Sequence, residues 1–416
     1  MISKDIAYEF IDIPQSGDVG FIFSIFLLSS GLSIFMWIGF QCRSPRKLLL
    51  LFSSLFSLIG MIIAYFSIDF WGLFLSFLIA GIGFGAIVPV TNSMLMDTVP
   101  FSKRGLGFGL MGLSITLGMG LSNIIVPIFV DFFYWKFSFI IETILIGTSI
   151  ICLFFASEPC LGSQEQAFSG LTNEELAQLI SPVTIKSLLS KMRNPAMISV
   201  IIVYFGVNLG WGAINFAIPS YFREEQGYSA FGVFLITLPG AISILAGPYW
   251  GRKSDQLFKR AKNARMQLSM QAIVITSLLF IFCYTINHFI LGYNSIFSII
   301  VFLTVSVAGY FFNSGISGLL NVTAGEINLP ESRMMVYCIM HLINVFGASL
   351  GSFIVPYLLT NTGSFYWTFF YMFIIIGISG VVIPFFYKIV SQEVNHVQEV
   401  LHGRKKDSLE HPEKAR

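Results

Sequence analysis

Long apolar runs are the feature that most constrains how this chain can fold. A bilayer core about 30 Å thick is crossed by a helix of about 20 apolar residues. The sequence contains eleven runs of roughly this length or more, at residues 19–40, 48–66, 70–97, 104–130, 134–156, 197–222, 229–250, 267–288, 295–325, 336–360 and 364–388. We therefore predict an all-α polytopic membrane protein with eleven transmembrane helices, divided five plus six.

The composition excludes the soluble alternatives. Hydrophobic residues make up 55% of the 416 residues and charged residues only 11%, against about 25% charged residues in an ordinary globular chain. So little charge cannot cover the surface of a soluble protein of this length, and so many apolar residues exclude a disordered chain. The net charge of +2 leaves no basic patch of the size that nucleic acid requires.

Catalytic and metal-binding patterns are missing from the sequence. Five cysteines, an odd number spread along the chain, fit neither a disulfide framework nor paired zinc ligands, and we interpret them as small apolar packing residues. The apolar runs show no metal-ligand spacing, no Ser/His/Asp set and no catalytic pair of acids. We therefore expect no enzyme activity, no metal and no cofactor.

The Lys and Arg residues predict the orientation of the helices. If the amino terminus lies outside and the helices alternate in direction, 21 of the 24 basic residues fall in inward loops or the inward tail, and only Lys4, Lys136 and Arg223 do not. Because basic residues favour the cytoplasmic side, we predict an extracytoplasmic segment at 1–18 and a cytoplasmic carboxyl terminus in the plasma or inner membrane. No Lys or Arg remains for the membrane interior, so we expect no buried cation in the mechanism.

A polar break divides the apolar runs. It contains four glutamates, one of them in the pattern Thr172-x-x-Glu175 that is typical of a capping box at a helix start. Apolar residues follow at helical spacing, at Ile185, Leu188, Leu189 and Met192. The predicted domains are an amino-terminal bundle, a cytoplasmic linker with short amphipathic helices, a carboxyl-terminal bundle and a tail that frays after one short helix, at residues 19–156, 157–195, 196–388 and 389–416.

The two predicted bundles share an internal repeat. Three residues recur at a separation of 229 positions, namely Arg104 with Arg333, Gly118 with Gly347 and Pro127 with Pro356. Two dipeptides recur at nearly the same separation, namely Ala80-Gly81 with Ala308-Gly309 and Tyr134-Trp135 with Tyr366-Trp367. Matches in order at nearly one separation are not expected by chance, even in so biased a composition. We therefore predict that the bundles are pseudo-symmetric.

A loop motif connects this repeat to a known family. Gly251-Arg-Lys-Ser-Asp255, followed by Lys259 and Arg260, lies on a short inward loop between two predicted helices. With this loop, the repeat and the linker, the chain from about residue 19 to 388 resembles the major facilitator superfamily. The resemblance implies two six-helix bundles that rock around a central site open to one side at a time. The amino-terminal loop departs from the motif, because Arg43 stands where the family has Asp.

The resemblance also accounts for the odd number of predicted helices. It makes residues 19–40 the family's second helix, which leaves the first helix absent from the sequence. A start codon upstream of Met1 or a truncated gene would each explain this absence. We expect the upstream start, because the rest of the chain matches the family.

Two polar stripes are predicted to line the central site. The members of each stripe are spaced three or four residues apart and so share one helix face. One stripe comprises Tyr204, Asn208, Trp211 and Asn215, and the other comprises Tyr310, Asn313, Ser317 and Asn321. Polar groups facing hydrocarbon would cost several kcal/mol each, so the stripes must face protein or water. The resemblance places them on the family's cavity-lining seventh and tenth helices, and we predict that they bind substrate. The alternative is hydrogen bonding between helices.

Two ionisable residues inside predicted spans are candidates for proton coupling. Glu142 is the one acid well inside a span, and His341 lies midway along its helix. A carboxyl or imidazole group at this depth could carry a coupled proton. The alternatives are a hydrogen-bonded or permanently protonated glutamate and a packed neutral histidine.

Charged residues at the inward ends of the helices are predicted to form a cytoplasmic gate. Asp97 and Glu326 are 229 positions apart, and each precedes an arginine by seven residues. We expect inner-face ion pairs that hold the two bundles in the outward-open state, a role similar to that of the loop motif in the family. The predicted gate residues are Arg46, Lys47, Asp97, Arg104, Asp255, Lys259, Arg260, Glu326 and Arg333. The alternative is ordinary interfacial charge.

These features together predict a secondary transporter of a small organic solute, driven by the solute's own gradient or by a coupled proton. The lack of a buried cation disfavours phosphorylated or multiply anionic substrates, and the stripes suit a neutral, zwitterionic, amphipathic or weakly acidic solute. We expect a monomer in the lipid bilayer that binds no nucleic acid. The alternative function is that of a non-transporting membrane sensor or partner-binding remnant of the transporter fold, which the absent first helix would favour.

Overall fold

Helices are the only regular secondary structure in the part of the chain that the structure describes. The computed structural model describes residues 16–410, except 42–43, 133, 181–192, 229–237, 239, 241–244 and 292–294. Packing divides these residues into two units. Unit one takes its residues from Met1–Met94, Gly118–Pro159 and Tyr337–Val345, and unit two takes its residues from Leu95–Leu117, Cys160–Val336 and Phe346–Arg416.

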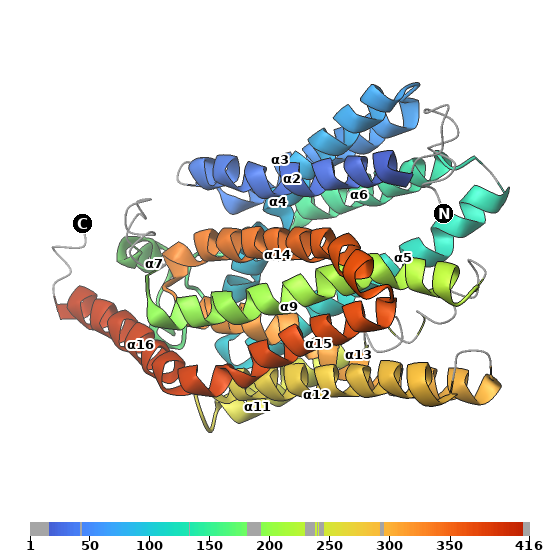
Figure 1. Ribbon diagram of the computed structural model, residues 1–416. Coiled ribbons are helices and arrows are strands. Elements are labelled where there is room, and N and C mark those ends of the chain that lie inside the picture. Colours follow the sequence, from blue (N-terminus) through green and yellow to red (C-terminus); the bar gives the residue numbers. More distant parts are fainter. Residues whose placement is uncertain are drawn as a thin grey trace. The chain divides into compact units, whose positions relative to one another are not determined.

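Five long helices form the amino-terminal part of the chain (Figure 1). They are α2 (Ser16–Gln41), α3 (Arg46–Phe66), α4 (Phe70–Thr98), α5 (Arg104–Phe132) and α6 (Phe137–Phe155). Shorter elements flank them, namely η1 (Phe101–Lys103) before α5, and η2 (Gln166–Phe168) and α7 (Asn173–Leu179) in the predicted linker. The predicted capping box is confirmed, because the Thr172 hydroxyl accepts from Glu175 N–H while the Glu175 carboxylate accepts from Thr172 N–H. The apolar residues predicted to follow it, at 185–192, lie outside the described residues.

The remaining helices form the carboxyl-terminal part. They are α9 (Pro195–Ser220), α11 (Ala246–Phe258), α12 (Ala264–Ile286), α13 (Ile296–Glu326), α14 (Arg333–Thr362), α15 (Phe365–Val381) and α16 (Tyr387–Glu410), with short turns η3 (Tyr221–Glu225), η5 (Asn287–Leu291), η6 (Pro330–Ser332) and η7 (Ile383–Phe386). Eight helical segments of the described chain are long and apolar enough to cross a membrane. The all-α membrane fold is therefore confirmed. The count of eleven stays a prediction, since most of 229–250 is outside the described residues.

The core of unit one forms between α2, α3, α4 and the start of α6. It is a cluster of buried apolar side chains, namely Ile22, Met61, Ala64, Leu73, Ala80, Trp135 and Phe139. Trp37 of α2 is also buried, and its indole N–H donates to the Ile82 carbonyl of α4 over 2.8 Å. A buried indole needs such an acceptor, so this bond ties α2 to α4.

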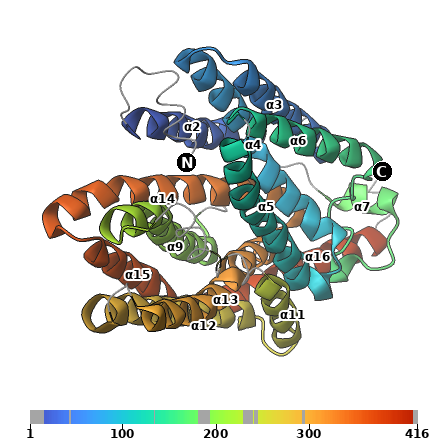
Figure 2. The same cartoon turned by 90° about the vertical axis from the view of Figure 1, so that its right-hand side faces the viewer.

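Aromatic side chains form the centre of unit two. In that unit α12 lies against α13 and α15, and α15 lies against α9 (Figure 2). The Trp211 ring of α9 has its centroid 5.8 Å from that of Phe280, 5.9 Å from Tyr310 and 6.1 Å from Phe373. Ring pairs at this spacing add to the hydrophobic gain of burial, and they fix the Trp211 face of α9 toward the other three helices.

The carboxyl-terminal tail differs from the expectation. It does not fray after one short helix, because α16 runs from Tyr387 to Glu410. Val390, Val394, Val397 and Leu401 recur at helical spacing along α16 and are all buried. The last two pack on Ala167, Phe168 and Leu176 of the linker. The prediction was wrong because it weighed the polarity of the tail and overlooked this apolar stripe, whose burial holds the helix together.

Candidate functional site

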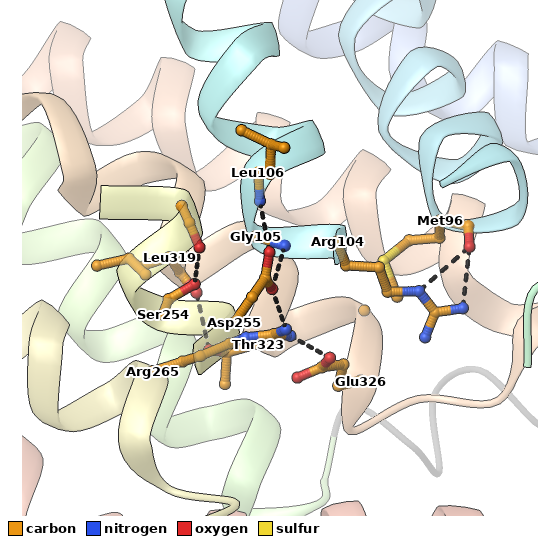
Figure 3. Close-up of polar contacts among 12 residues, drawn as sticks. Met96, Arg104, Gly105, Leu106, Ser254, Asp255, Arg265, Leu319, Thr323 and Glu326 are labelled. Carbon is orange, nitrogen blue, oxygen red and sulfur yellow. Dashed lines mark hydrogen bonds and ion pairs between the residues drawn. The ribbon is translucent and has the colours of Figure 1, made fainter. Parts of the chain in front are cut away.

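Seven charged residues of unit two come together in what we call the arginine cluster. Its members are Asp97, Arg104, Glu165, Asp255, Arg265, Glu326 and Arg333, and each is at most 8% exposed. They come from the ends of α4, α11 and α13, the starts of α5, α12 and α14, and the linker. Buried charges persist in proteins when they are paired, and Figure 3 shows part of this pairing.

Glu165 of the linker joins two arginines. Its Oε1 atom lies 2.6 Å from Arg104 Nη2 and 2.6 Å from Arg333 Nη1. Burial raises the pKa of the Glu165 carboxyl, but the charges of Arg333 and Arg104 and their hydrogen bonds outweigh burial and lower the pKa to about 2. Glu165 is therefore a carboxylate at every physiological pH and neutralises part of the charge of both guanidinium groups.

Both arginines also bond the backbone of the helix that precedes them. Arg104 donates from Nε and Nη2 to the Met96 carbonyl, over 3.2 and 2.9 Å. Arg333 donates from Nε to the Gly325 carbonyl, over 2.8 Å. In each case the carbonyl lies eight residues before the arginine, at the end of α4 or α13. We call this arrangement the arginine–carbonyl clamp.

Asp97 holds the linker against the end of α4. Its Oδ1 atom accepts from Gly162 N–H over 2.9 Å and lies 3.7 Å from Arg333 Nη1, while its carbonyl accepts from the Ser163 hydroxyl over 2.7 Å. Gly162 has φ +72, a left-handed conformation that favours glycine. The turn that presents the Gly162 N–H to Asp97 therefore depends on this glycine.

Asp255 of the loop motif binds the start of α5. Its two carboxylate oxygens accept from the backbone N–H groups of Gly105 and Leu106, over 2.8 and 2.9 Å (Figure 3). Arg265 donates to the same carboxylate over 2.9 Å and also pairs with Glu326. A carboxylate at a helix start satisfies orphan backbone donors and the helix dipole together. Asp255 thus connects α11, α12 and α5.

Other predicted gate residues lie outside the cluster. Arg46, in unit one, donates from Nη2 to the Pro159 carbonyl over 2.7 Å and from its backbone N–H to Glu158 over 2.8 Å. Lys47 is partly exposed and donates to the Phe154 carbonyl. Lys259 and Arg260 are exposed. Among the described residues, Lys47, Lys259 and Arg260 form no ion pair.

Sequence reasoning missed two members of the cluster. Glu165 was one of four linker glutamates, and only its place seven residues before Thr172 of the capping box, in a turn that Gly162 permits, sets it apart. Arg265 was one of six basic residues predicted for the inward loop around the motif. Its position at the second residue of α12, next to the end of the motif's own helix, is the signal that could have found it.

The two polar stripes make mostly local hydrogen bonds. Asn208 donates to the Tyr204 carbonyl over 2.7 Å, and Asn321 donates to the carbonyl and hydroxyl of Ser317 over 3.0 and 3.2 Å. Asn215 and Ser317 are exposed, and Asn313 is half-buried. A pair of aromatic rings brings the two stripes together.

That ring pair joins Trp211 of α9 with Tyr310 of α13. The Trp211 indole N–H is buried and finds no acceptor among the described residues. A buried donor without an acceptor loses the hydrogen bond that water would give it. A ligand that offers an acceptor to Trp211 would restore that bond.

The two proton-coupling candidates lie in unit one in different surroundings. His341 of α14 is buried, with Nε2 3.2 Å from the Ser30 hydroxyl of α2 and its ring 5.7 Å from that of Phe84. Glu142 of α6 has an exposed side chain. The described residues contain no group of three or more His, Cys, Asp and Glu that could hold a metal ion.

Comparison with known proteins gives one family. Residues 6–327 match the model described as Major Facilitator Superfamily. The human organic anion transporter MFSD10 (TETRAN) has the same fold, with a TM-score of 0.68 over 88% of this chain and 83% of that one, at 15% identity. The proton:xylose symporter XylE, solved with 6-bromo-6-deoxy-D-glucose, has a TM-score of 0.67 over 92% and 89%, at 16% identity.

Sequence relatives match part of the chain at higher identity. An uncharacterized transporter of Buchnera aphidicola is 25% identical over 312 residues, which are 74% of this chain and 72% of that protein. The vacuolar membrane amino acid uptake transporter fnx2 of Schizosaccharomyces pombe is 29% identical over 97 residues, 23% of this chain. The match spans only 17% of the length of fnx2.

Proposed function

The chain belongs to the major facilitator superfamily, and from this premise we propose that it moves a small organic solute by alternating access. It is an integral multi-pass membrane protein and a transporter rather than an enzyme. The observation that carries the proposal is the arginine cluster. Seven paired charges tie together the ends of six helices and the linker, so opening that end of unit two requires the ion pairs to separate.

We propose that the arginine cluster is the cytoplasmic gate in its closed state. The excess of Lys and Arg in the loops at this end supports the orientation, because such loops remain on the cytoplasmic side. The cell membrane is then the site of action, and the carboxyl terminus is cytoplasmic. In this proposal two acids close the gate. Asp255 of the motif binds the start of α5, and Glu165 of the linker binds both Arg104 and Arg333.

We propose that the stripe residues bind the solute. The supporting observation is the Trp211 indole N–H, which is buried beside Tyr310 without an acceptor. Indole, phenol, amide and hydroxyl groups carry no charge and suit a neutral, zwitterionic or weakly acidic solute. A carboxylate or hydroxyl oxygen of that solute would accept from Trp211. His341 and Glu142 are the candidates for a coupled proton.

Counterflow in proteoliposomes tests this function. The panel takes its classes from the relatives: amino acids, pentoses and hexoses, and organic anions. We expect one class to exchange against its own preloaded solute. Replacing Trp211 by Phe, which removes the N–H and keeps a ring, should raise the apparent KM of that exchange by about 2–10-fold, the value of one lost hydrogen bond. Trp71→Phe, at an exposed tryptophan of unit one, is the matched control. Exchange of no class, with the protein folded and correctly inserted, would overturn the proposal.

A further inference from the structure

A pocket of about 590 Å³ lies beside the arginine cluster, within unit two. Three segments line it: the turn before α5 at 100–102, the linker at 163–169 and the loop from the end of α11 to the start of α12. We propose that this pocket binds a phosphate monoester. None of the stripe residues lines it, so it is a different site from the one proposed for the transported solute.

Two lysines supply uncompensated positive charge to the pocket. Lys259 and Lys262 both line it, and neither forms an ion pair or hydrogen bond with another described residue. The Lys262 ammonium lies 4.6 Å from the centroid of the Phe258 ring, which holds its position without using its N–H donors. Two cations that face a shared cavity without counterions favour an anion there.

Arg265 adds a buried donor that has no acceptor. Its side chain is 1% exposed, and two of its nitrogens pair with Asp255 and Glu326. The third, Nε, finds no acceptor among the described residues. Almost all buried donors in proteins are satisfied. Because Arg265 lines the pocket, a phosphate oxygen there would supply the missing acceptor, in a charge-assisted hydrogen bond.

The two carboxylates that line the pocket, Glu165 and Asp255, do not pair with its lysines. Glu165 lies between Arg104 and Arg333, and Asp255 is held by Arg265 and two backbone N–H groups. Both carboxylates therefore have partners of their own and do not serve as counterions to the two lysines. Glu165 Oε2, for which the described residues offer no donor, is placed to accept a hydroxyl of the ligand.

The size and walls of the pocket favour an ester over a bare phosphate ion. A volume of about 590 Å³ is in the range of small-molecule sites, roughly 300–1,000 Å³. Pro100, Phe101 and Phe258 form an apolar wall, with the two rings 5.9 Å apart. The lysines would bind the phosphate oxygens of a monoester, and this wall would contact its carbon group. The ester is either a soluble metabolite or a lipid headgroup.

Calorimetric titration of the purified full chain with phenyl phosphate tests the site. We expect saturable binding that Lys262→Ala and Lys259→Ala each weaken at least tenfold and that Lys262→Arg retains. Arg252→Ala is the matched control, because Arg252 is an exposed cation on α11 that does not line the pocket, and its binding should stay within twofold of wild type. Benzyl alcohol, which has the ring without the phosphate, should not bind.

A second arm distinguishes the soluble ligand from the lipid. The chain is placed in nanodiscs of phosphatidylcholine with or without phosphatidic acid, a lipid whose headgroup is a phosphate monoester. If the lipid is the natural source, phosphatidic acid should raise the melting temperature in wild type and Arg252→Ala but not in Lys262→Ala. Binding of neither probe, or equal binding by all variants, would overturn the site. Binding is measured without flux, so a chain that binds the probe but transports nothing would refute the proposed transport and leave this site standing.

Discussion

The starts of α5 and α14 are related by the internal repeat. The contacts of their first arginines are alike, whereas the contacts of the backbone N–H groups that follow are not. Arg104 and Arg333 make the same clamp to a carbonyl eight residues earlier and share the same carboxylate, Glu165. The backbone N–H groups that follow differ. At α5 they are bound by Asp255, whereas at α14 the N-cap Ser332 makes no side-chain cap.

This difference shows that the symmetric and asymmetric parts of the site have different origins. The clamp needs only an arginine and the helix before it, so each repeat builds its own. Two of the acids have no repeat-related counterpart: Glu165 comes from the linker, and Asp255 lies in α11, where the predicted loop motif is helical and its amino-terminal counterpart in the sequence has Arg43. The linker is thus a structural part of the site and more than a connection.

Replacing Glu165 by alanine should have the largest effect, because both clamps would lose their shared carboxylate. Removing one partner of a buried ion pair costs about 3–5 kcal/mol. We expect the free energy of unfolding in detergent to fall by about that amount. Glu174→Ala, at an exposed glutamate of the same linker, should change it by less than about 0.5 kcal/mol. Equal losses in the two variants would show that Glu165 is not the joining residue.

Acid should reproduce that loss reversibly. The pKa of Glu165 is lowered from 4.5 to about 2, so its contribution to stability is complete above about pH 4.5 and is lost as the pH falls toward 2. A shift of this size corresponds to about 3 kcal/mol. Unfolding measured between about pH 5 and about pH 3 should show a smaller loss in Glu165→Gln than in wild type. Parallel curves would refute the pairing.

Lysine at either arginine tests whether the two clamps are equivalent. Lysine keeps the charge but lacks the planar fork, so it cannot hold the carbonyl and Glu165 at once. We expect Arg104→Lys and Arg333→Lys each to lower the free energy of unfolding by about 1–3 kcal/mol. The two losses should agree within about 0.5 kcal/mol. A loss confined to one variant would mean that the two repeat-related arginines do not contribute equally to stability.

Asp255→Asn should affect one helix start and leave the other unchanged. The variant keeps the shape of the side chain but removes the charge that faces Arg265 and the α5 backbone. We expect hydrogen exchange to accelerate about tenfold in peptides that cover the start of α5, equivalent to about 1.4 kcal/mol. Exchange at the start of α14 should not change. Equal acceleration at the starts of α5 and α14 would contradict the proposed difference between these two helix starts.

The smallest effect is expected in the polar stripes. Asn208→Ala and Asn313→Ala should each raise the apparent KM for the solute identified by counterflow by about 2–10-fold, the value of one lost hydrogen bond. Expression should stay unchanged. Asn361→Ala, at an exposed asparagine of α14, is the control. If both stripe variants transport with wild-type kinetics, these residues do not bind the solute.

Most of the fold could be predicted because apolar length is a strong signal. The run 104–130 became α5 at Arg104–Phe132, and the run 295–325 became α13 at Ile296–Glu326. The helix in the tail was missed because its apolar residues form a narrow stripe. Such a stripe stabilises a helix only when another segment covers it, and the sequence does not show which segment does. Val397 and Leu401 are stable in a helix because Phe168 and Leu176 of the linker cover them.

The site was predictable where the repeat marks it. Arg104, Arg333, Asp97 and Glu326 were found through their common separation, and all four lie in the cluster. Their partners could not be assigned, because ion pairing depends on which side chains fold to the same place. Glu326, for example, pairs with Arg265, which its spacing from Arg333 did not indicate. The stripe residues and the proton candidates stay predictions until transport is measured.

The end of α16 is joined to the same linker that supplies Glu165. Arg404 donates to the Leu179 carbonyl over 3.4 Å and Lys405 to the Ser169 carbonyl over 2.8 Å, beside the contacts of Val397 and Leu401. For anyone engineering this chain, the last turns of α16 are therefore not a neutral place for an affinity tag or a fluorescent fusion. A truncation that removed Val397 and Leu401 as well would uncover Phe168 and loosen the segment on which the arginines depend.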